Sequence, residues 1–280
     1  CGNHRKRFNF VQPLGYRTSY RPSDYSDATQ SQMFFSRARL ATELEGVDSY
    51  EHRGMRVAVG SQEKVLTIND NRGSLFALGR QADQSWTVSE ADPSGSPEDL
   101  NTKAVALADL RTTDVLVLEI SNDSVPTGTV PTSSKVCESG LAAMHSFAQV
   151  LRRAAHAHLD IAADELEVGL QPHSANGVQT HRVYIADALD NGAGFAVELG
   201  EPKVLSGVID FIRNEIGPSF ERAEHINQCT TSCPRCIRSY ENRFDHWALN
   251  WRLALDVTDI ANGGSPSMDR WRDRAEQSAR

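Results

Sequence analysis

The stretch CTTSCPRC, residues 229–236, decides how the rest of the chain is interpreted, because it places three of the five cysteines in one short segment. Zinc prefers thiolate ligands at about 2.3 Å in a tetrahedral arrangement, and turns of two or three residues let neighbouring sulfur atoms reach the same ion. A set of buried thiols or a disulfide is the alternative. The Cys-x3-Cys-x2-Cys spacing favours a zinc knuckle with Cys229, Cys233 and Cys236 as ligands.

The fourth corner of the tetrahedron has three candidates in the sequence, His246, His225 and Cys137. We predict His246, because it lies at the start of an expected helix, beyond a loop long enough to fold back, and neutral imidazole is a common zinc ligand. Cys137 is the second candidate, since it is distant in sequence but could arrive through the fold. With four protein ligands the Zn²⁺ would be structural, because no open position is left for an activated water.

Length and composition limit the class of protein. A chain of 280 residues can bury a core in one large domain or two small ones. No apolar run reaches transmembrane length, and the first seven residues are polar and basic, so we expect a cytosolic protein without a membrane partner. In a reducing compartment, five cysteines favour metal binding over a disulfide framework.

Charge is distributed unevenly along the chain. The net charge of -8 argues against a protein that coats nucleic acid over its whole surface. Basic residues nevertheless surround the zinc segment, where Arg235, Arg238 and Arg243 are candidates for phosphate contact, although such clusters are usually solvated faces. Residues 1–35 form a second basic segment, and Cys1-Gly2 could be the trailing half of an upstream knuckle, since the absence of an initiator Met suggests a fragment or a processed piece.

The first half of the chain shows the signals of antiparallel β structure. Short β-rich runs separated by turns predict strands at 55–59, 65–68 and 74–78, and a strongly apolar run predicts a further strand at 115–120. We therefore expect a β-rich domain over residues 36–120.

The second half changes to helical periodicity. Apolar residues from Leu141 to Leu159 fall on one face and predict a core helix of about five turns. Alternation then predicts two paired strands, 166–170 and 183–185, with a polar turn at 173–180, followed by helices at 204–216 and 245–260. Trp247 and Trp251 are expected on the apolar face of the last helix, and residues 262–280 in a mobile tail. The fold class is α+β, with an antiparallel β-rich part followed by an α/β part that carries the knuckle.

A glycine-rich turn, residues 187–195, follows the second of these strands. Such a turn can hold a phosphate on its backbone N–H groups, but this one lacks the residues of a P-loop and the glycines of a dinucleotide site, so a tight turn is favoured. A nuclease that uses Asp187, Asp190 and Glu198 on a divalent metal is a further hypothesis. Nothing arranges these acids as a recognised catalytic set.

Several longer runs extend the cysteine motif into a family pattern. They are residues 146–155 (SFAQVLRRAA), 159–161, 165–170 (ELEVGL), the 187–195 turn, and the knuckle followed by Ile237-Arg238-x-Tyr240-x-Asn242, His246 and residues 249–255. With these runs, the chain resembles the C-terminal region of bacterial superfamily 2 DEAD/DEAH-box helicases that end in an MrfA-type zinc-binding domain, here residues 136–261. Helicases with four cysteines in the cluster have a further Cys just before the knuckle, and its absence here leaves the fourth ligand open.

The resemblance implies an accessory domain of an ATP-driven DNA translocase that works in DNA repair or in antiphage defence of the DISARM kind. Its partners would be DNA and a helicase motor, in the same polypeptide or on another subunit. The chain has no Gly-x4-Gly-Lys-Ser/Thr loop and no Asp-Glu-x-His box, so we expect no ATP hydrolysis by this chain alone. The folded knuckle would present Arg235, Arg238 and Arg243 to phosphates. A protein-interaction module that never touches DNA is the alternative, and the acidic net charge favours it.

Overall fold

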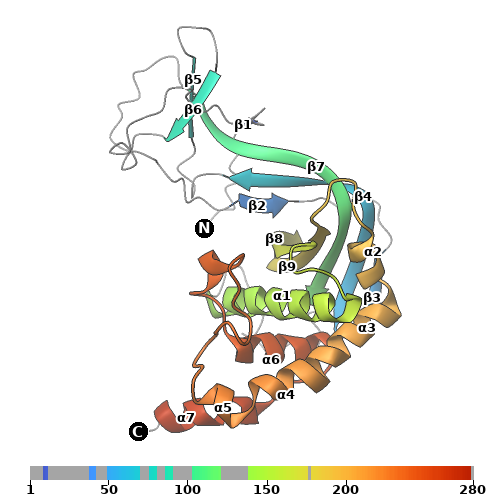
Figure 1. The fold of residues 1–280 in the computed structure, drawn as a ribbon, viewed down its shortest axis with the longest axis vertical. Helices are drawn as coiled ribbons and strands as arrows, with labels where there is room; N and C mark the ends of the chain where they lie inside the picture. Colours follow the sequence, from blue (N-terminus) through green and yellow to red (C-terminus); the bar gives the residue numbers. More distant parts are fainter. Residues whose placement is uncertain are drawn as a thin grey trace. The chain divides into compact units, whose positions relative to one another are not determined.

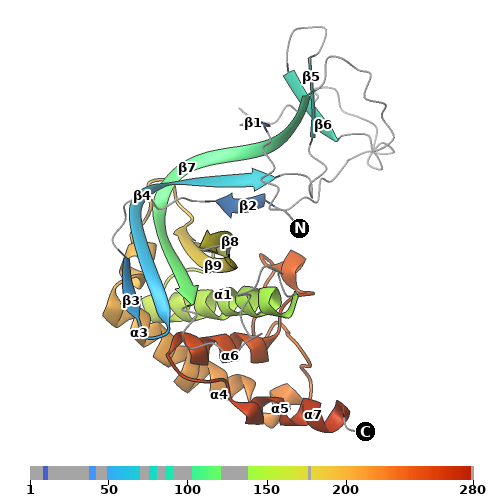
Figure 2. The same cartoon turned by 180° about the vertical axis from the view of Figure 1, so that it is seen from behind.

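Strands and helices form two units along this chain. The computed structural model describes residues 9–11, 38–41, 49–69, 76–80, 86–90, 103–120, 138–175 and 178–278 (Figures 1 and 2). Mostly antiparallel strands are combined with helices, which confirms the predicted α+β class. One unit consists of Cys1–Ala41 and Val65–Leu110, and the other of Thr42–Lys64 and Arg111–Arg280. The predicted β-rich region, residues 36–120, therefore contributes to both units.

The first unit contains strands only, within the part of it that the structure describes. Its β5 pairs antiparallel with β6 and with β7, and β1 pairs parallel with β7. The expected basic residues Arg5 to Arg7, Arg17 and Arg21, and the dipeptide Cys1-Gly2, lie outside the described residues. The strands of this unit are β1 (Asn9–Val11), β2 (Ala38–Ala41), β5 (Phe76–Arg80), β6 (Trp86–Glu90) and parts of two long strands, β4 (Met55–Asn69) and β7 (Lys103–Ile120).

In the second unit, a β-hairpin pairs with residues 115–118 of β7. Strands β8 (Leu166–Ala175) and β9 (Val178–Asp187) pair antiparallel, and β9 also pairs with β7, Val115 lying opposite Ala186. The two predicted strands and their pairing are confirmed. The expected turn at 173–180 is shorter in the structure, because His173 pairs with Thr180 within the ladder. Strand β3 (Ser49–His52) pairs antiparallel with the start of β4.

Helix α1 (Glu138–Leu159) is the centre of the second unit. It realises the helical period that the sequence predicts, and Met144, Phe147 and Leu151 on its apolar face are fully buried. It packs against the β8–β9 hairpin on one side and against α3 and α6 on another (Figure 1). Because α1 contacts the hairpin, α3 and α6, it is held rigidly, and a segment that packs on its exposed face is held rigidly as well.

A run of short helices follows the hairpin. The predicted helix at 204–216 lies within the stretch Pro202–Phe220, whose middle turn is a π-helix. None of the helices in the described part of the chain is long and apolar enough to cross a membrane. The helices of this run are α2 (Phe195–Leu199), α3 (Pro202–Phe211), η4 (Ile212–Ile216), α4 (Gly217–Phe220), α5 (Ala223–Ile226) and η5 (Arg243–Asp245).

Helix α6 (Trp251–Ala261) begins six residues later than the sequence predicts. Asn250 has extended backbone angles and its side chain accepts a hydrogen bond from the Arg252 backbone N–H, so it caps the helix and separates it from the preceding turns. Trp251 is consequently buried, whereas Trp247 is 77% exposed. The prediction that both tryptophans share the apolar face of one helix was wrong.

The C-terminal segment has regular structure where the sequence predicts a mobile tail. It forms η6 (Met268–Trp271) and α7 (Arg272–Ser278). Arg270 pairs with Asp256, with Asp259 at 3.1 Å and with Glu221 at 2.9 Å, and the Trp271 indole N–H donates to Asp256 at 2.8 Å. Residues of this polar segment are therefore partners of acidic side chains on α6, which is why the segment is ordered.

We expect truncation after Asn262 to destabilise the protein by about 3–5 kcal/mol, because it strips partners from buried charges. Arg252 is 1% exposed and donates to the Arg270 carbonyl at 3.0 Å and to Asp273 at 2.7 Å. Urea unfolding followed by circular dichroism measures the effect. Removal of the last two residues alone is the control, and equal midpoints for the two truncations would contradict the prediction.

Candidate metal centre

Four side chains converge at the predicted knuckle. The ligand atoms of His225, Cys229, Cys233 and Cys236 all lie within 4.8 Å of one another. His225, Cys229 and Cys236 are buried, and Cys233 is partly buried. The structure therefore brings the three predicted cysteines together and adds His225 as the fourth member.

Local backbone structure sets this arrangement. The Cys229 backbone N–H donates to the His225 carbonyl at 2.8 Å, so the two residues lie one turn apart at the end of α5 and face the same side. A tight turn follows, in which the N–H groups of Cys236 and Arg238 both donate to the Cys233 carbonyl, at 3.0 and 3.1 Å. This turn directs the last two sulfur atoms back toward the first pair.

The spacing of the donors fits zinc. Bonds of about 2.3 Å to sulfur and about 2.0–2.1 Å to nitrogen put two sulfurs of a tetrahedral site about 3.8 Å apart, and a sulfur and a nitrogen about 3.6 Å apart. Cys229 Sγ and Cys236 Sγ are 3.9 Å apart, and Cys233 Sγ lies 3.5 Å from His225 Nε2. A set of three sulfurs and one imidazole nitrogen suits zinc rather than magnesium or calcium, which prefer oxygen ligands.

His225 is held in the orientation that a metal ligand needs. Its Nδ1 lies 2.7 Å from the Phe220 carbonyl oxygen, so Nδ1 carries the proton and Nε2 presents its lone pair to the cluster. The ring packs between Phe220 and Trp251, with centroids 5.6 and 5.5 Å away. Such a hydrogen bond behind the ring is the usual support of a ligating histidine.

Burial and hydrogen bonding treat the three thiols differently. Burial raises the pKa of Cys229 and the pKa of Cys236. For Cys233 burial also raises the pKa, but a hydrogen bond from the Arg235 backbone N–H and the contact with the His225 ring outweigh it and lower the pKa to about 6. Cys233 is then a thiolate at neutral pH, and the other two thiols would release their protons when a cation binds.

The structure does not bring His246 to the cluster. Its Nε2 lies 2.9 Å from Asn242 Oδ1 and 3.0 Å from the Ser239 carbonyl, two acceptors that require a proton on this nitrogen. His225 lies in the position predicted for His246, because α5 places it one turn before Cys229. The His-x3-Cys spacing of His225 and Cys229 is the sequence signal that could have found it. Cys137 lies outside the described residues.

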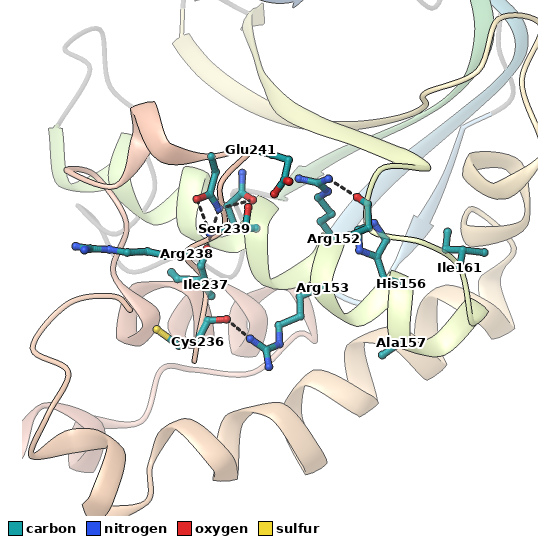
Figure 3. Close-up of a pocket in the computed structure, with 13 residues that line it drawn as sticks. Arg152, Arg153, His156, Ala157, Ile161, Cys236, Ile237, Arg238, Ser239 and Glu241 are labelled. Atoms are coloured by element: carbon teal, nitrogen blue, oxygen red, sulfur yellow. Dashed lines mark hydrogen bonds between the residues drawn. The ribbon is translucent and has the colours of Figure 1, made fainter. Parts of the chain in front are cut away.

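Helix α1 holds the segment that follows the cysteines. Arg153 donates to the Cys236 carbonyl (Figure 3) and to the Arg235 carbonyl. Asn242 Nδ2 donates to Gln149 at 2.9 Å and to the Ile237 carbonyl at 2.8 Å. We call residues 237–247 the post-knuckle segment. These bonds fix its backbone on the rigid base that α1 provides.

The three predicted nucleic-acid-binding arginines lie in or beside this segment. Arg235 and Arg243 are exposed, and Arg238 is partly exposed. Arg235 donates to Gln228 at 2.5 Å, Arg238 to Ser232 at 2.8 Å and Arg243 to the Tyr240 carbonyl at 3.1 Å. The Arg243 guanidinium also stacks on the Tyr240 ring at 4.3 Å.

Large aromatic side chains accompany these arginines. Tyr240 is 75% exposed and Trp247 is 77% exposed. Because α1 fixes the backbone between them, both rings are presented to solvent from a fixed scaffold.

The acids of the glycine-rich turn have a structural role. Asp187 is buried, and its carboxylate accepts hydrogen bonds from the backbone N–H groups of Ala193, Gly194, Phe195 and Ala196, at 2.6–3.2 Å. Gly194 makes this possible with φ of 88°, a left-handed conformation that glycine adopts without strain. These four N–H groups are occupied by the Asp187 carboxylate and are therefore not available to a phosphate. Asp190 and Glu198 are exposed and form no metal-binding group with Asp187 among the described residues.

Comparison with known families assigns this part of the chain. Residues 147–237 match the MrfA Zn-binding domain. The match to the MrfA Zn-binding domain runs from the middle of α1 to the residue after Cys236, so it includes all four members of the cluster. It lies within the region 136–261 that the sequence resemblance indicates.

Two solved structures of DUF1998 helicase MrfA resemble the chain. One, bound to DNA, has a TM-score of 0.49 and 14% identity, and covers 80% of this chain and 25% of that one. The other, bound to DNA and AMPPNP, has a TM-score of 0.32 and 12% identity, and covers 79% of this chain and 22% of that one. The present chain thus spans about a quarter of the length of those helicase chains. No curated protein matches it.

Proposed function

We propose that this chain is a zinc-folded accessory region of a superfamily 2 DNA helicase, and that the post-knuckle segment contacts DNA. The match of residues 147–237 to the MrfA Zn-binding domain supports the first part. We also propose that the chain acts in the cytosol, in DNA repair or in antiphage defence. The helicase motor would lie in the same polypeptide or on another subunit.

The metal in this proposal is structural. Residues His225, Cys229, Cys233 and Cys236 would hold Zn²⁺ with every corner filled by protein, and three of these side chains are buried. The ion would supply cross-linking rather than chemistry. It would cross-link the end of α5 and the turn before the post-knuckle segment.

DNA contact rests on one observation, the concentration of basic and aromatic side chains on a rigid segment. Arg235 and Arg243 are exposed, the Arg243 guanidinium stacks on the Tyr240 ring, and the Tyr240 and Trp247 side chains are about three-quarters exposed. Guanidinium groups pair with phosphates, and exposed aromatic rings stack on unpaired bases. Of the nearby acids, Glu241 on the same segment interacts with the Arg243 charge, whereas Asp256 is bonded to Arg270 and Trp271.

Fluorescence anisotropy with labelled single-stranded and duplex oligonucleotides tests this proposal. A variant with Arg235, Arg238 and Arg243 changed to Gln is expected to bind at least about tenfold more weakly, and to show a shallower salt dependence by about two to three phosphate contacts. Arg56→Gln, at an exposed arginine of β4, is the matched control. Unchanged affinity in the triple variant, or no DNA binding by the zinc-loaded parent, would refute DNA contact.

A protein-docking role is the second candidate. The chain carries a net charge of -8, and the 77% exposed Trp247 is typical of an aromatic anchor at an interface. In that case the post-knuckle segment would bind a helicase motor domain. Trp247→Ala would abolish this binding and leave the affinity for DNA unchanged.

A further inference from the structure

A pocket of about 360 Å³ lies between α1 and the post-knuckle segment. From α1 it is lined by Gln149, Arg152, Arg153 and His156, and from the segment by residues that include Glu241 (Figure 3). Both walls are fixed to each other by the hydrogen bonds of Asn242 and Arg153 described above. The pocket is therefore built from rigid elements rather than from a loose loop.

Two nitrogen atoms in the pocket walls have no hydrogen-bond partner among the residues that the structure describes. Arg152 Nε and His156 Nε2 are buried and make no hydrogen bond to the described residues. Arg152 uses one terminal nitrogen on the Ala163 carbonyl and has no ion pair with an acidic side chain in the described part of the chain. Buried donors without partners are rare in native proteins, and a bound ion or ligand group is one of their ordinary explanations.

Charge favours an anion as that ligand. Arg152 and Arg153 each carry a positive charge, and Figure 3 shows the Glu241 carboxylate directed toward Arg152 from the opposite wall. Burial, followed by the nearby Arg152 charge, lowers the pKa of His156 to about 4, so this ring is neutral at neutral pH and adds no charge. Three guanidinium groups line the pocket, those of Arg152, Arg153 and Arg238, against the single carboxylate of Glu241, so the lining has an excess of positive charge. Glu167 and Asp164 also interact with the Arg152 charge and reduce this excess.

We propose that this pocket binds a phosphate group, with Arg152 and Arg153 as its cationic contacts and His156 as a further hydrogen-bond partner. The tetrahedral oxygens of phosphate accept several charge-assisted hydrogen bonds from different directions, which suits donors on successive turns of one helix. Glu241 competes with the anion for Arg152 and so limits the affinity. The phosphate can belong to a free nucleotide or to a nucleic-acid backbone, and only the second source rests on the proposed function.

Nuclear magnetic resonance of the zinc-loaded full chain tests the proposal through the arginine Nε–H signals. Three probes are titrated: inorganic phosphate, dAMP and a thymidine octamer without terminal phosphates. We expect the Arg152 signal to shift, Arg152→Gln to weaken binding at least about tenfold, and Arg56→Gln to have no effect. Glu241→Gln is expected to tighten binding about threefold or more, because it removes the competing charge.

The variants separate the possible results. A gain of affinity in Glu241→Gln cannot come from misfolding, so it protects the test if Arg152→Gln unfolds the protein. Binding of phosphate and dAMP alone supports a free nucleotide as the source, and binding of the octamer alone supports a backbone phosphate. If the protein binds inorganic phosphate but not DNA, the phosphate site is supported and the proposed DNA contact is refuted. No shift of Arg152 with any probe, or equal affinities in all variants, would overturn the inference.

Discussion

Replacing Cys236 by serine is expected to remove bound zinc from the protein and to destabilise the helical body of which residues 225–247 are a part. The thiol is buried, and its Sγ lies 3.9 Å from Cys229 Sγ within the cluster. Loss of a structural zinc site costs several kcal/mol, which for a chain of this size lowers the melting temperature by about 10 °C or more. Metal content by mass spectrometry and thermal unfolding by circular dichroism measure the two effects.

The histidine variants make this prediction specific. His225→Ala is expected to lower zinc content and stability almost as far as Cys236→Ser, because it removes the fourth donor and an aromatic packing partner of Trp251. His246→Ala keeps all four donors, so its zinc content should equal that of the parent. A chelator should shift the parent protein toward the Cys236→Ser behaviour. Zinc loss in His246→Ala with retention in His225→Ala would reverse our assignment of the ligands.

Asp187→Ala is expected to destabilise the protein by about 3 kcal/mol or more, with zinc content unchanged in the folded fraction. The substitution leaves four backbone N–H groups at the start of α2 without their acceptor. Urea unfolding gives the free energy of unfolding for comparison with the parent.

Two matched variants define what the Asp187 result means. Asp190→Ala changes an exposed acid of the same turn and should alter stability by no more than about 0.5 kcal/mol. Asp187→Asn keeps one acceptor oxygen and should fall between the two. If Asp187→Ala proved as stable as Asp190→Ala, the buried carboxylate would not be what holds the turn.

Sequence patterns predicted the parts of this molecule that depend on local chemistry. The spacing of the cysteines located the cluster, the helical period located α1, and alternation located the β8–β9 hairpin. Each of these signals depends on residues close together in the chain, where periodicity and turn length act directly.

The errors have a common physical origin in tertiary partners. His246 was predicted as the ligand, but its Nε2 is hydrogen-bonded to Asn242 and to the Ser239 carbonyl. The Phe220 carbonyl instead orients the His225 ring toward the sulfur atoms. Residues 262–280 looked mobile because they are polar, yet Arg270 reaches Asp256 and Asp259 on α6. No local pattern reports such partners, since they are defined only when distant elements meet.

The attachment of the knuckle to α1 determines whether the knuckle can fold alone. Arg153 and Gln149 hold the post-knuckle segment on a helix that the β8–β9 hairpin, α3 and α6 also share. Trp251, at the start of α6, contacts the ring of His225 from the other side. A peptide of residues 225–247 would lack all of these contacts, so we expect that it does not fold alone. In the whole chain, the knuckle should unfold together with the helical body in a single cooperative transition.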